Sequence, residues 1–171
     1  NKHMNTKDTI ALDWMKRYTG TSPDEYGDWI LLTNFQNYVD KFATRFNVEI
    51  NGLGGPMTSA INSEGLSIIN FGIGSANAAT IMDLLSCINP KGVLFLGKCG
   101  GLKKTTDIGH FILPTAAIRG EGTSNDYFPQ EVPAMPSFKL HKYVSDILVD
   151  KNIEYRNTIA NKNAFCHGKL H

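Results

Sequence analysis

The apolar residues in the first third of the chain follow two patterns in turn, one helical and one extended. Residues Ile10, Trp14, Met15 and Tyr18 recur at helical spacing, and they predict a first helix that ends near Gly20, since glycine suits a helix C-terminus. The short apolar run 29–32 predicts a strand. A second helical pattern follows it at Phe35, Tyr38, Val39, Phe42 and Phe46, so this region should form a βα unit.

The next stretch, from Met57 to Gly101, contains several apolar runs separated by turn residues. The segment 62–65 (Asn-Ser-Glu-Gly) predicts a hairpin turn between strands at 57–61 and 66–71. Ser75 can cap a helix that runs to about Cys87, and Asn89-Pro90 should stop that helix before a strand at 92–96. Further along, the pattern predicts a strand at 111–114, a long polar loop at 119–136 and a helix at 137–150.

These elements predict an α/β fold with a mixed sheet, in which parallel strands accompany at least one antiparallel pair. The runs 66–71 and 92–96 are nearly continuous apolar segments, which is typical of strands covered on both faces. Ligands of open α/β sheets bind in the crevice at the carboxyl ends of the strands. Small, flexible residues follow these strands at Gly72, Gly74, Gly97, Gly100 and Gly101, so the functional site is expected there.

Composition narrows the class of ligand. The chain has 171 residues, 42% of them hydrophobic, which is enough to bury a core, and its formal net charge is only +1. Binding to nucleic acid or to an anionic membrane needs clustered lysine and arginine, which a near-neutral chain does not indicate. A small molecule is therefore the expected partner. No run approaches the roughly 20 apolar residues of a membrane-spanning helix, and the N-terminus lacks a signal-peptide core, which predicts a cytoplasmic protein.

Cysteine usage and the first residues add little chemistry. The three cysteines, Cys87, Cys99 and Cys166, lack CxxC spacing, so neither a disulfide framework nor a zinc knuckle is indicated. Residues 1–4 (NKHM) are interpreted as a remnant of an expression tag, with Met4 as the native start. His167 and His171 lie near Cys166, but histidines on a terminal tail are more often unstructured than metal ligands, and no metal is predicted.

Three motif matches in the glycine-rich region do not support the usual interpretation. Residues 92–98 fit GxxxxGK, but a phosphate loop needs a flexible loop where 93–96 predicts a strand. Residues 72–77 resemble part of a dinucleotide fingerprint, yet Asn77 stands where a small residue is required and the next strand ends in Lys98 rather than in an acidic residue. Cys99 beside Lys98 could be an activated thiolate, or it could simply fill a tight turn.

The interpretation that remains for this region is a binding site for a phosphate group or a ribose. A helix N-terminus at 75–77 presents unpaired backbone N–H groups, which attract anions, and Lys98 follows the neighbouring strand. The alternative is that Lys98 is a solvated surface lysine. The surrounding glycines leave these two interpretations evenly balanced.

Several long segments resemble the AMP nucleosidases of the short form, which belong to the nucleoside phosphorylase and nucleosidase superfamily. The similar segments are ILLTNFQNYVDKF (30–42), NFGIGSANAATIMDLL (70–85), VLFLGKCGGL (93–102) and IGHFILPTAAIRGEGTSNDYFPQEVPA (108–134). The similarity runs in register from about Asp8 to Thr158. It implies a three-layer αβα fold around a central mixed sheet, truncated at the C-terminus, and hydrolysis of AMP to adenine and ribose 5-phosphate without a cofactor. It also implies a homo-oligomer, for which a hexamer is one candidate.

The resemblance assigns substrate-binding positions in two groups. Ile73 and Gly74 match the segment beside the ribose and base, and Lys98, Cys99 and Gly100 match the turn beside the glycosidic bond. The residues that match the loop near the ribose 5-phosphate or a subunit contact are Arg119, Glu121, Thr123 and Ser124. Alternatively, Arg119 and Glu121 could simply pair with each other on that loop.

Two departures from the family pattern bear on the reaction. Phosphorolytic members grip phosphate with arginines after the first strand and in the strand before the GxCG turn, whereas this chain has no arginine in 34–38 and has Phe95 at the strand position. A guanidinium suits a phosphate dianion, so water becomes the expected nucleophile. In addition, the family's Met-Glu pair and its purine-protonating Asp are expected C-terminal to this chain, so the catalytic residues are unknown.

The domain assignment follows from these departures. Residues 5–158 are expected to form the N-terminal part of a nucleoside phosphorylase-like domain, and 159–171 an unassigned tail without a carboxylate. Breaking a bond to a purine needs an acid for the leaving base, so this chain is expected to be incomplete and inactive. Three alternatives stay open: a purine nucleoside phosphorylase, a non-catalytic nucleotide-binding fragment and a nicotinamide-binding domain.

Overall fold

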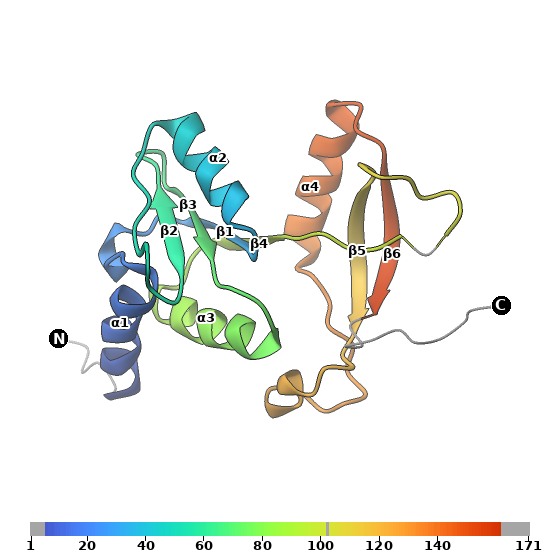
Figure 1. Cartoon of the computed structure of the whole chain (residues 1–171). Helices are drawn as coiled ribbons and strands as arrows, with labels where there is room; N and C mark the ends of the chain where they lie inside the picture. The colour runs from blue at the N-terminus through green and yellow to red at the C-terminus, as the bar shows by residue number, and fades with distance from the viewer. Residues whose placement is uncertain (1–5, 102, 162–171) are drawn as a thin grey trace. The chain divides into compact units, whose positions relative to one another are not determined.

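A computed structural model of the chain describes residues 6–101 and 103–161, and it contains two compact units, Asn1–Lys98 and Cys99–His171. They are called the N-terminal unit and the C-terminal unit below. Each unit combines strands with helices (Figure 1). Residues 1–4 and the candidate metal-binding residues Cys166, His167 and His171 lie outside the described residues.

The N-terminal unit contains a four-stranded mixed sheet. Its elements are α1 (Thr6–Thr19), the 3-10 helix η1 (Pro23–Glu25), β1 (Trp29–Thr33), α2 (Gln36–Phe46), β2 (Thr58–Ile61), β3 (Leu66–Asn70), α3 (Ser75–Ile88) and β4 (Gly92–Leu96). The strand order is β2-β3-β1-β4, with β1 parallel to both β3 and β4 and with β2 antiparallel to β3. The predicted βα unit, hairpin and mixed sheet are therefore confirmed. Because residues 92–96 form β4, they cannot be the flexible loop of a GxxxxGK motif.

Helices cover both faces of this sheet, which gives the predicted three layers (Figure 1). On one face, α1 and α3 pack against β1 and β3; the buried side chains there include Met15, Ile69 and Leu85. On the other face, α2 packs against β2 and β3, with Val39, Phe42, Ala60 and Ile68 buried. Adjacent residues of β3 thus enter opposite cores, as the alternation of a strand requires, and each fully buried aliphatic side chain stabilises the fold by about 1.5–3 kcal/mol.

Two details of the helix starts differ from the sequence prediction. Ser75 is the first residue of α3 and not its cap; Gly74 holds that position with a φ of 105°. A residue with a Cβ, such as serine, would be strained at this backbone φ, so glycine takes the cap position and the cap has no side-chain hydrogen bond. Phe35, predicted on the apolar face of α2, precedes the helix as its N-cap residue.

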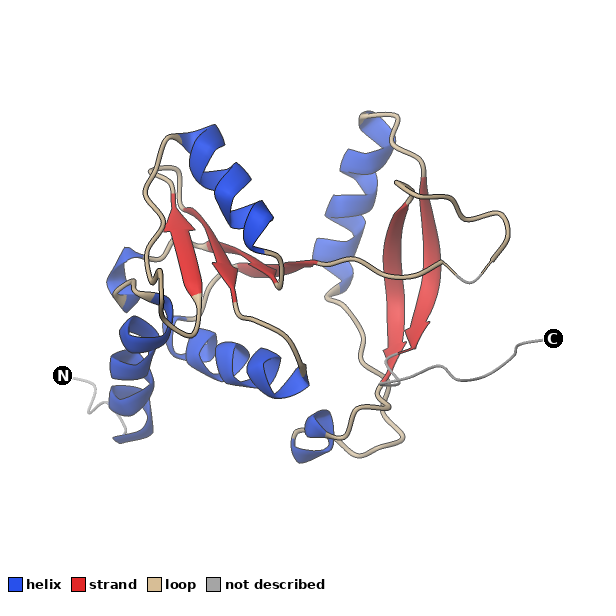
Figure 2. Ribbon diagram, viewed as in Figure 1, coloured by secondary structure: helices blue, strands red, loops and turns tan. Residues whose placement is uncertain are grey.

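The described part of the C-terminal unit contains a parallel strand pair, one α-helix and one short 3-10 helix; Figure 2 shows its helices in blue and its strands in red. Its elements are β5 (Phe111–Ile118), the 3-10 helix η2 (Thr123–Asp126), α4 (Phe138–Asp150) and β6 (Tyr155–Asn161). β5 is longer than predicted, and β6 was not predicted at all. The pairing of β5 with β6 shifts register between Pro114 and Ala116, where proline cannot donate a ladder hydrogen bond. β6 spans both Thr158, the last residue of the expected domain, and Ile159, the first residue of the expected tail.

Candidate functional site

The parallel strands of the N-terminal unit end together at one edge of the sheet. Thr33, the last residue of β1, is in register with Asn70 of β3 and with Leu96 of β4. The segments that follow these strands, 34–38, 71–74 and 97–98, are therefore neighbours. We call these three segments the carboxyl edge; they include the predicted site residues Ile73, Gly74 and Lys98.

The glycine-containing turn after β3 is fixed by an amide network. The backbone N–H of Gly72 donates to Asn70 Oδ1 at 3.1 Å, and Asn70 Nδ2 donates to Gln36 Oε1 at 3.0 Å. The Thr58 hydroxyl donates to the same Gln36 oxygen at 2.7 Å. This network ties the last residue of β3 and the first residue of β2 to the first turn of α2. Through Asn70 it also fixes the backbone of the glycine-containing turn after β3.

The helix α3 begins directly after this turn, at Ser75. Gly74 has open space where a Cβ would lie, so glycine is required there by its φ of 105° and not by crowding. The preceding Ile73 is 80% exposed. An exposed apolar side chain beside the N-terminus of a helix offers a surface for a base or ribose next to a region that attracts anionic atoms.

Lys98 lies against two aromatic rings. Its Nζ is 4.4 Å from the centroid of the Phe35 ring and 5.8 Å from that of Tyr38, both within the range of a cation–π interaction. Within the described part of the N-terminal unit, no carboxylate forms an ion pair with this ammonium group. Lys98 is exposed, and its ammonium group contacts two uncharged aromatic rings at the carboxyl edge. Because these rings do not neutralise its charge, the ammonium group stays available to an anion.

Two further features lie at or next to the carboxyl edge. The rings of Phe71 and Phe95 lie 5.9 Å apart, and Phe95 is 55% exposed. The side-chain oxygen of Asn34 is buried and accepts no hydrogen bond from the part of the chain that the structure describes. No acidic residue occurs in the three segments of the edge.

The remaining predicted site residues belong to the C-terminal unit, where Cys99 and Gly100 are exposed at its start and Cys99 is a free thiol. Arg119 donates to four backbone carbonyls of one loop, those of Ser124, Phe128, Pro129 and Val132. Glu121 accepts hydrogen bonds from the backbone N–H and the hydroxyl of Ser124. Thr123 is half-buried and begins η2. Both charged side chains therefore bond within the loop itself.

The structure thus gathers the predicted residues into two sets, Ile73, Gly74 and Lys98 in one unit and the Arg119 loop in the other. Sequence reasoning noted that the stretch 34–38 lacks arginine, but it missed the contact of Phe35 and Tyr38 with Lys98, because these aromatic residues were assigned to the core face of a helix. Their position directly after a strand end is the signal that could have identified them. Among the described residues there is no group of three or more His, Cys, Asp or Glu that could hold a metal. A separate open hollow of about 500 Å³, lined by Leu12, Pro23, Asp24 and Ile88, contains none of the predicted site residues.

Comparison with known proteins shows similarity over most of the chain, not only at the candidate site. The family model described as "Phosphorylase superfamily" matches residues 6–165. The AMP nucleosidase of Escherichia coli K12 is 25% identical over 161 residues, an alignment that covers 72% of this chain and 33% of the relative. The chain therefore spans about a third of that relative's length. No described helix is long and apolar enough to cross a membrane.

Solved structures show the same likeness. The crystal structure of AMP nucleosidase from Bacteroides thetaiotaomicron is 46% identical with a TM-score of 0.91, and the match covers 96% of this chain and 72% of that one. The purine nucleoside phosphorylase of Toxoplasma gondii, at 16% identity and a TM-score of 0.77, covers 88% of this chain and 62% of its own and supports the fold alone.

Proposed function

The chain belongs to the phosphorylase superfamily, and from this membership we propose that the protein cleaves the N-glycosidic bond of AMP. The observation that carries the choice of substrate is the similarity to the Bacteroides AMP nucleosidase, which exceeds the similarity to the phosphorylase structure by 30 percentage points of identity, 46% against 16%. Superfamily membership supports the proposal that an N-glycosidic bond is cleaved, and the similarity to the Bacteroides enzyme supports the proposal that the substrate is AMP.

The nucleophile in this proposal is water. The oxygen of water bonds to C1′ of the ribose, the bond from C1′ to the purine nitrogen breaks, and the leaving adenine takes up a proton. The products are ribose 5-phosphate and adenine. The carboxyl edge supports hydrolysis because the segment 34–38 has no arginine and presents the rings of Phe35 and Tyr38, which cannot grip a phosphate dianion as a guanidinium does.

We assign roles to the predicted residues as follows. Ile73 and Gly74 lie beside the ribose and base, and Lys98 contacts an anionic group of the substrate. Cys99 and Gly100 form the turn next to the glycosidic bond. The loop of Arg119, Glu121, Thr123 and Ser124 lies near the 5′-phosphate or at a subunit contact. The protein acts in this proposal as a cytoplasmic homo-oligomer.

Product analysis tests the nucleophile. In phosphate buffer, any longer protein that contains this sequence should release ribose 5-phosphate from AMP, and in H₂¹⁸O the label should enter the sugar. Adenine release should not require added phosphate. Formation of ribose 1,5-bisphosphate would show that phosphate is the nucleophile and would overturn the proposal of hydrolysis.

We propose that the acid that protonates the purine lies C-terminal to this chain, as the resemblance implies, so the 171-residue chain should be inactive by itself. Loss of a general acid commonly costs 10²- to 10⁴-fold in rate. Adenine release by this chain, compared with that by the longer protein, measures the difference. Equal turnover numbers would place the acid within these 171 residues.

A second candidate is a nucleotide-binding protein without catalytic activity, and the absence of acidic residues from the carboxyl edge favours it. Calorimetric titration with AMP, adenosine and NAD separates the candidates. Binding of AMP without adenine release by the longer protein would support the second candidate, whereas preferential binding of NAD would contradict both.

A further inference from the structure

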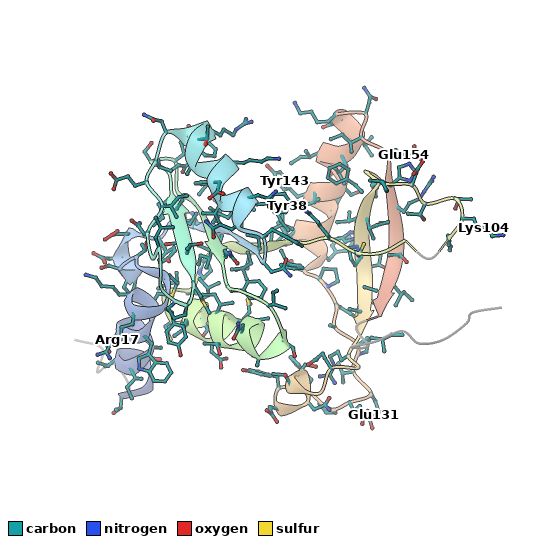
Figure 3. All side chains as sticks on the ribbon, in the orientation of Figure 1. Arg17, Tyr38, Lys104, Glu131, Tyr143 and Glu154 are labelled. Carbon is teal, nitrogen blue, oxygen red and sulfur yellow. The ribbon has the colours of Figure 1, made fainter. Side chains whose placement is uncertain are left out.

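The contact of Lys98 with Phe35 and Tyr38 joins two elements that are far apart in sequence. Lys98 follows β4, whereas Phe35 is the N-cap residue of α2 and Tyr38 lies in its first turn. The two rings meet edge to face, with centroids 5.8 Å apart and an interplanar angle of 71°. We call Phe35 and Tyr38 the aromatic pair; Figure 3 labels Tyr38 on α2.

The aromatic pair is itself supported by the core. Tyr38 is half-buried and packs against the cluster of Val39, Phe42, Ala60 and Ile68 beneath α2. The Phe35 backbone N–H donates to Thr33 Oγ1 at 3.1 Å, and Thr33 is fully buried at the end of β1. The core therefore supports the Tyr38 side chain, and the end of β1 fixes the backbone from which the Phe35 ring projects.

We propose that Phe35 and Tyr38 are positioning residues that hold the Lys98 ammonium at the carboxyl edge for a phosphate group of the ligand. The inference rests on the proposed function, in which Lys98 contacts an anionic group. A lysine side chain loses considerable rotamer entropy when a ligand orders it, and prior contact with the rings reduces that loss. Unlike a carboxylate partner, the rings leave the charge unneutralised and do not compete with an anion for its N–H donors.

Phosphate can reach this cation in two forms, as the 5′-phosphate of a nucleotide or as free inorganic phosphate. Both present the same anionic oxygens, so the contact geometry is shared. The aromatic pair then sets affinity for the phosphate group and contributes nothing specific to an uncharged nucleoside. This expectation separates a positioning role from general support of the fold.

A double-mutant cycle in the longer protein measures the positioning effect. Dissociation constants for AMP, adenosine and inorganic phosphate are determined by calorimetry for wild type, Phe35→Leu, Lys98→Met and the double variant. Lys98→Met should weaken AMP binding by about 10- to 100-fold, the loss of a charge-assisted hydrogen bond. Phe35→Leu should weaken it by about 2- to 5-fold through loss of the ring. The double variant should be no weaker than Lys98→Met, and adenosine binding should not change.

Matched controls are available on the same helix. Lys41→Met removes an exposed lysine charge of α2, and Phe46→Leu truncates a ring that packs on Phe42 at 4.7 Å. Neither control should alter the ratio of AMP to adenosine affinity. Phe35→Trp, which keeps an aromatic face, should retain AMP affinity. If Phe35→Leu does not fold, Phe35→Met takes its place in the cycle.

The outcomes decide the inference independently of the reaction. Additive losses for Phe35→Leu and Lys98→Met, or equal losses for AMP and adenosine, would overturn it, as would a wild type that binds neither AMP nor phosphate. Coupled losses confined to inorganic phosphate would retain it and identify the free anion as the ligand. Coupled losses for AMP in a protein that releases no adenine would retain the inference while the proposed function fails.

Discussion

The two units use similar elements but differ sharply in how much they bury. Every buried side chain among the described residues belongs to the N-terminal unit, where three layers enclose two apolar clusters. In the described part of the C-terminal unit, by contrast, large apolar side chains remain exposed on each main element. Examples are Phe111 and Ile118 of β5, Phe138 and Tyr143 of α4, and Ile159 of β6.

The difference follows from the number of strands and from their cover. β3 is central in a four-stranded sheet with helices on both faces, so its middle residues are buried on either side. Among the described residues of the C-terminal unit, β5 and β6 form a two-stranded sheet that is accompanied by one long helix, α4. A two-stranded sheet is marginally stable by itself because it has too little apolar area to bury. The comparison teaches that a strand's apolar residues stabilise it only where a further layer covers them.

The largest expected effect contrasts one isoleucine from each unit. Ile69→Ala should lower the free energy of unfolding by about 2–5 kcal/mol, because Ile69 is fully buried between α3, α1 and the sheet. Ile159→Ala should change it by less than about 0.5 kcal/mol, because Ile159 is 64% exposed. Urea denaturation of this chain measures both. A comparable loss for Ile159→Ala would show that another surface covers β6.

The same contrast explains how much of the fold could be predicted from sequence. In the N-terminal unit, strands such as 66–70 are apolar because they are buried, so the sequence pattern reports the structure directly. β6 was missed because its residues, with Arg156 and Asn157 inside a half-polar run, carry no period-2 apolar signal. β6 is defined by its parallel pairing with β5, a partner well over 30 residues away, and such pairing leaves no local mark in the sequence.

The second effect concerns the loop held by Arg119. Arg119→Lys keeps the charge but loses the planar fork that reaches the carbonyls of Ser124, Phe128, Pro129 and Val132. We expect local opening of residues 120–132 to become easier by about 1–2 kcal/mol, measured by hydrogen exchange. The control Arg156→Lys touches only a surface ion pair with Glu154 and should have little effect on this loop. Unchanged exchange in Arg119→Lys would mean that the loop is ordered by other contacts.

A third effect uses one tyrosine from each unit. The Tyr26 hydroxyl donates to Thr19 Oγ1 at 2.6 Å inside a buried polar network, and burial raises the pKa of Tyr26 above its usual value of 10.0. The folded state therefore keeps this proton at a pH where the unfolded state has lost it. The resulting stabilisation is complete below about pH 10 and is lost as pH rises from there through the raised pKa.

Tyr26→Phe should therefore remove part of the alkaline loss of stability, in addition to costing about 0.5–1.5 kcal/mol at neutral pH through the lost hydrogen bond. Thermal denaturation between pH 8 and pH 11 measures both terms. Tyr143→Phe on α4, where the side chain is 63% exposed, is the matched control and should change neither. Identical pH profiles for wild type and Tyr26→Phe would contradict this account.

The candidate site was predicted only in part, for a related reason. Gly72 and Gly74 are visible in sequence because glycines at the carboxyl end of a buried strand are typical of ligand-binding turns, and Lys98 is visible because it follows the next strand of the sheet. The roles of Phe35 and Tyr38 are not visible, since an aromatic residue at helical spacing looks the same whether it fills the core or holds a cation. Only the register of Thr33 with Leu96 brings these rings within reach of Lys98.

The smallest effect compares two exposed ion pairs with the same i, i+4 spacing, Asp13–Arg17 on α1 and Lys142–Asp146 on α4. Each should contribute about 0.3–0.5 kcal/mol in a double-mutant cycle to alanine and should weaken in 1 M salt. Asp13–Arg17 should be the stronger pair although its atoms are 2.9 Å apart, against 2.6 Å for Lys142–Asp146. In the α1 pair the acidic residue lies toward the helix N-terminus and the basic residue toward the C-terminus, so both charges interact favourably with the helix dipole. The order on α4 is reversed. Equal coupling energies would show that the order of the two charges along the helix does not matter for these pairs. If the free energy of global unfolding shows a coupling energy for the α1 pair but none for the α4 pair, the two units unfold separately.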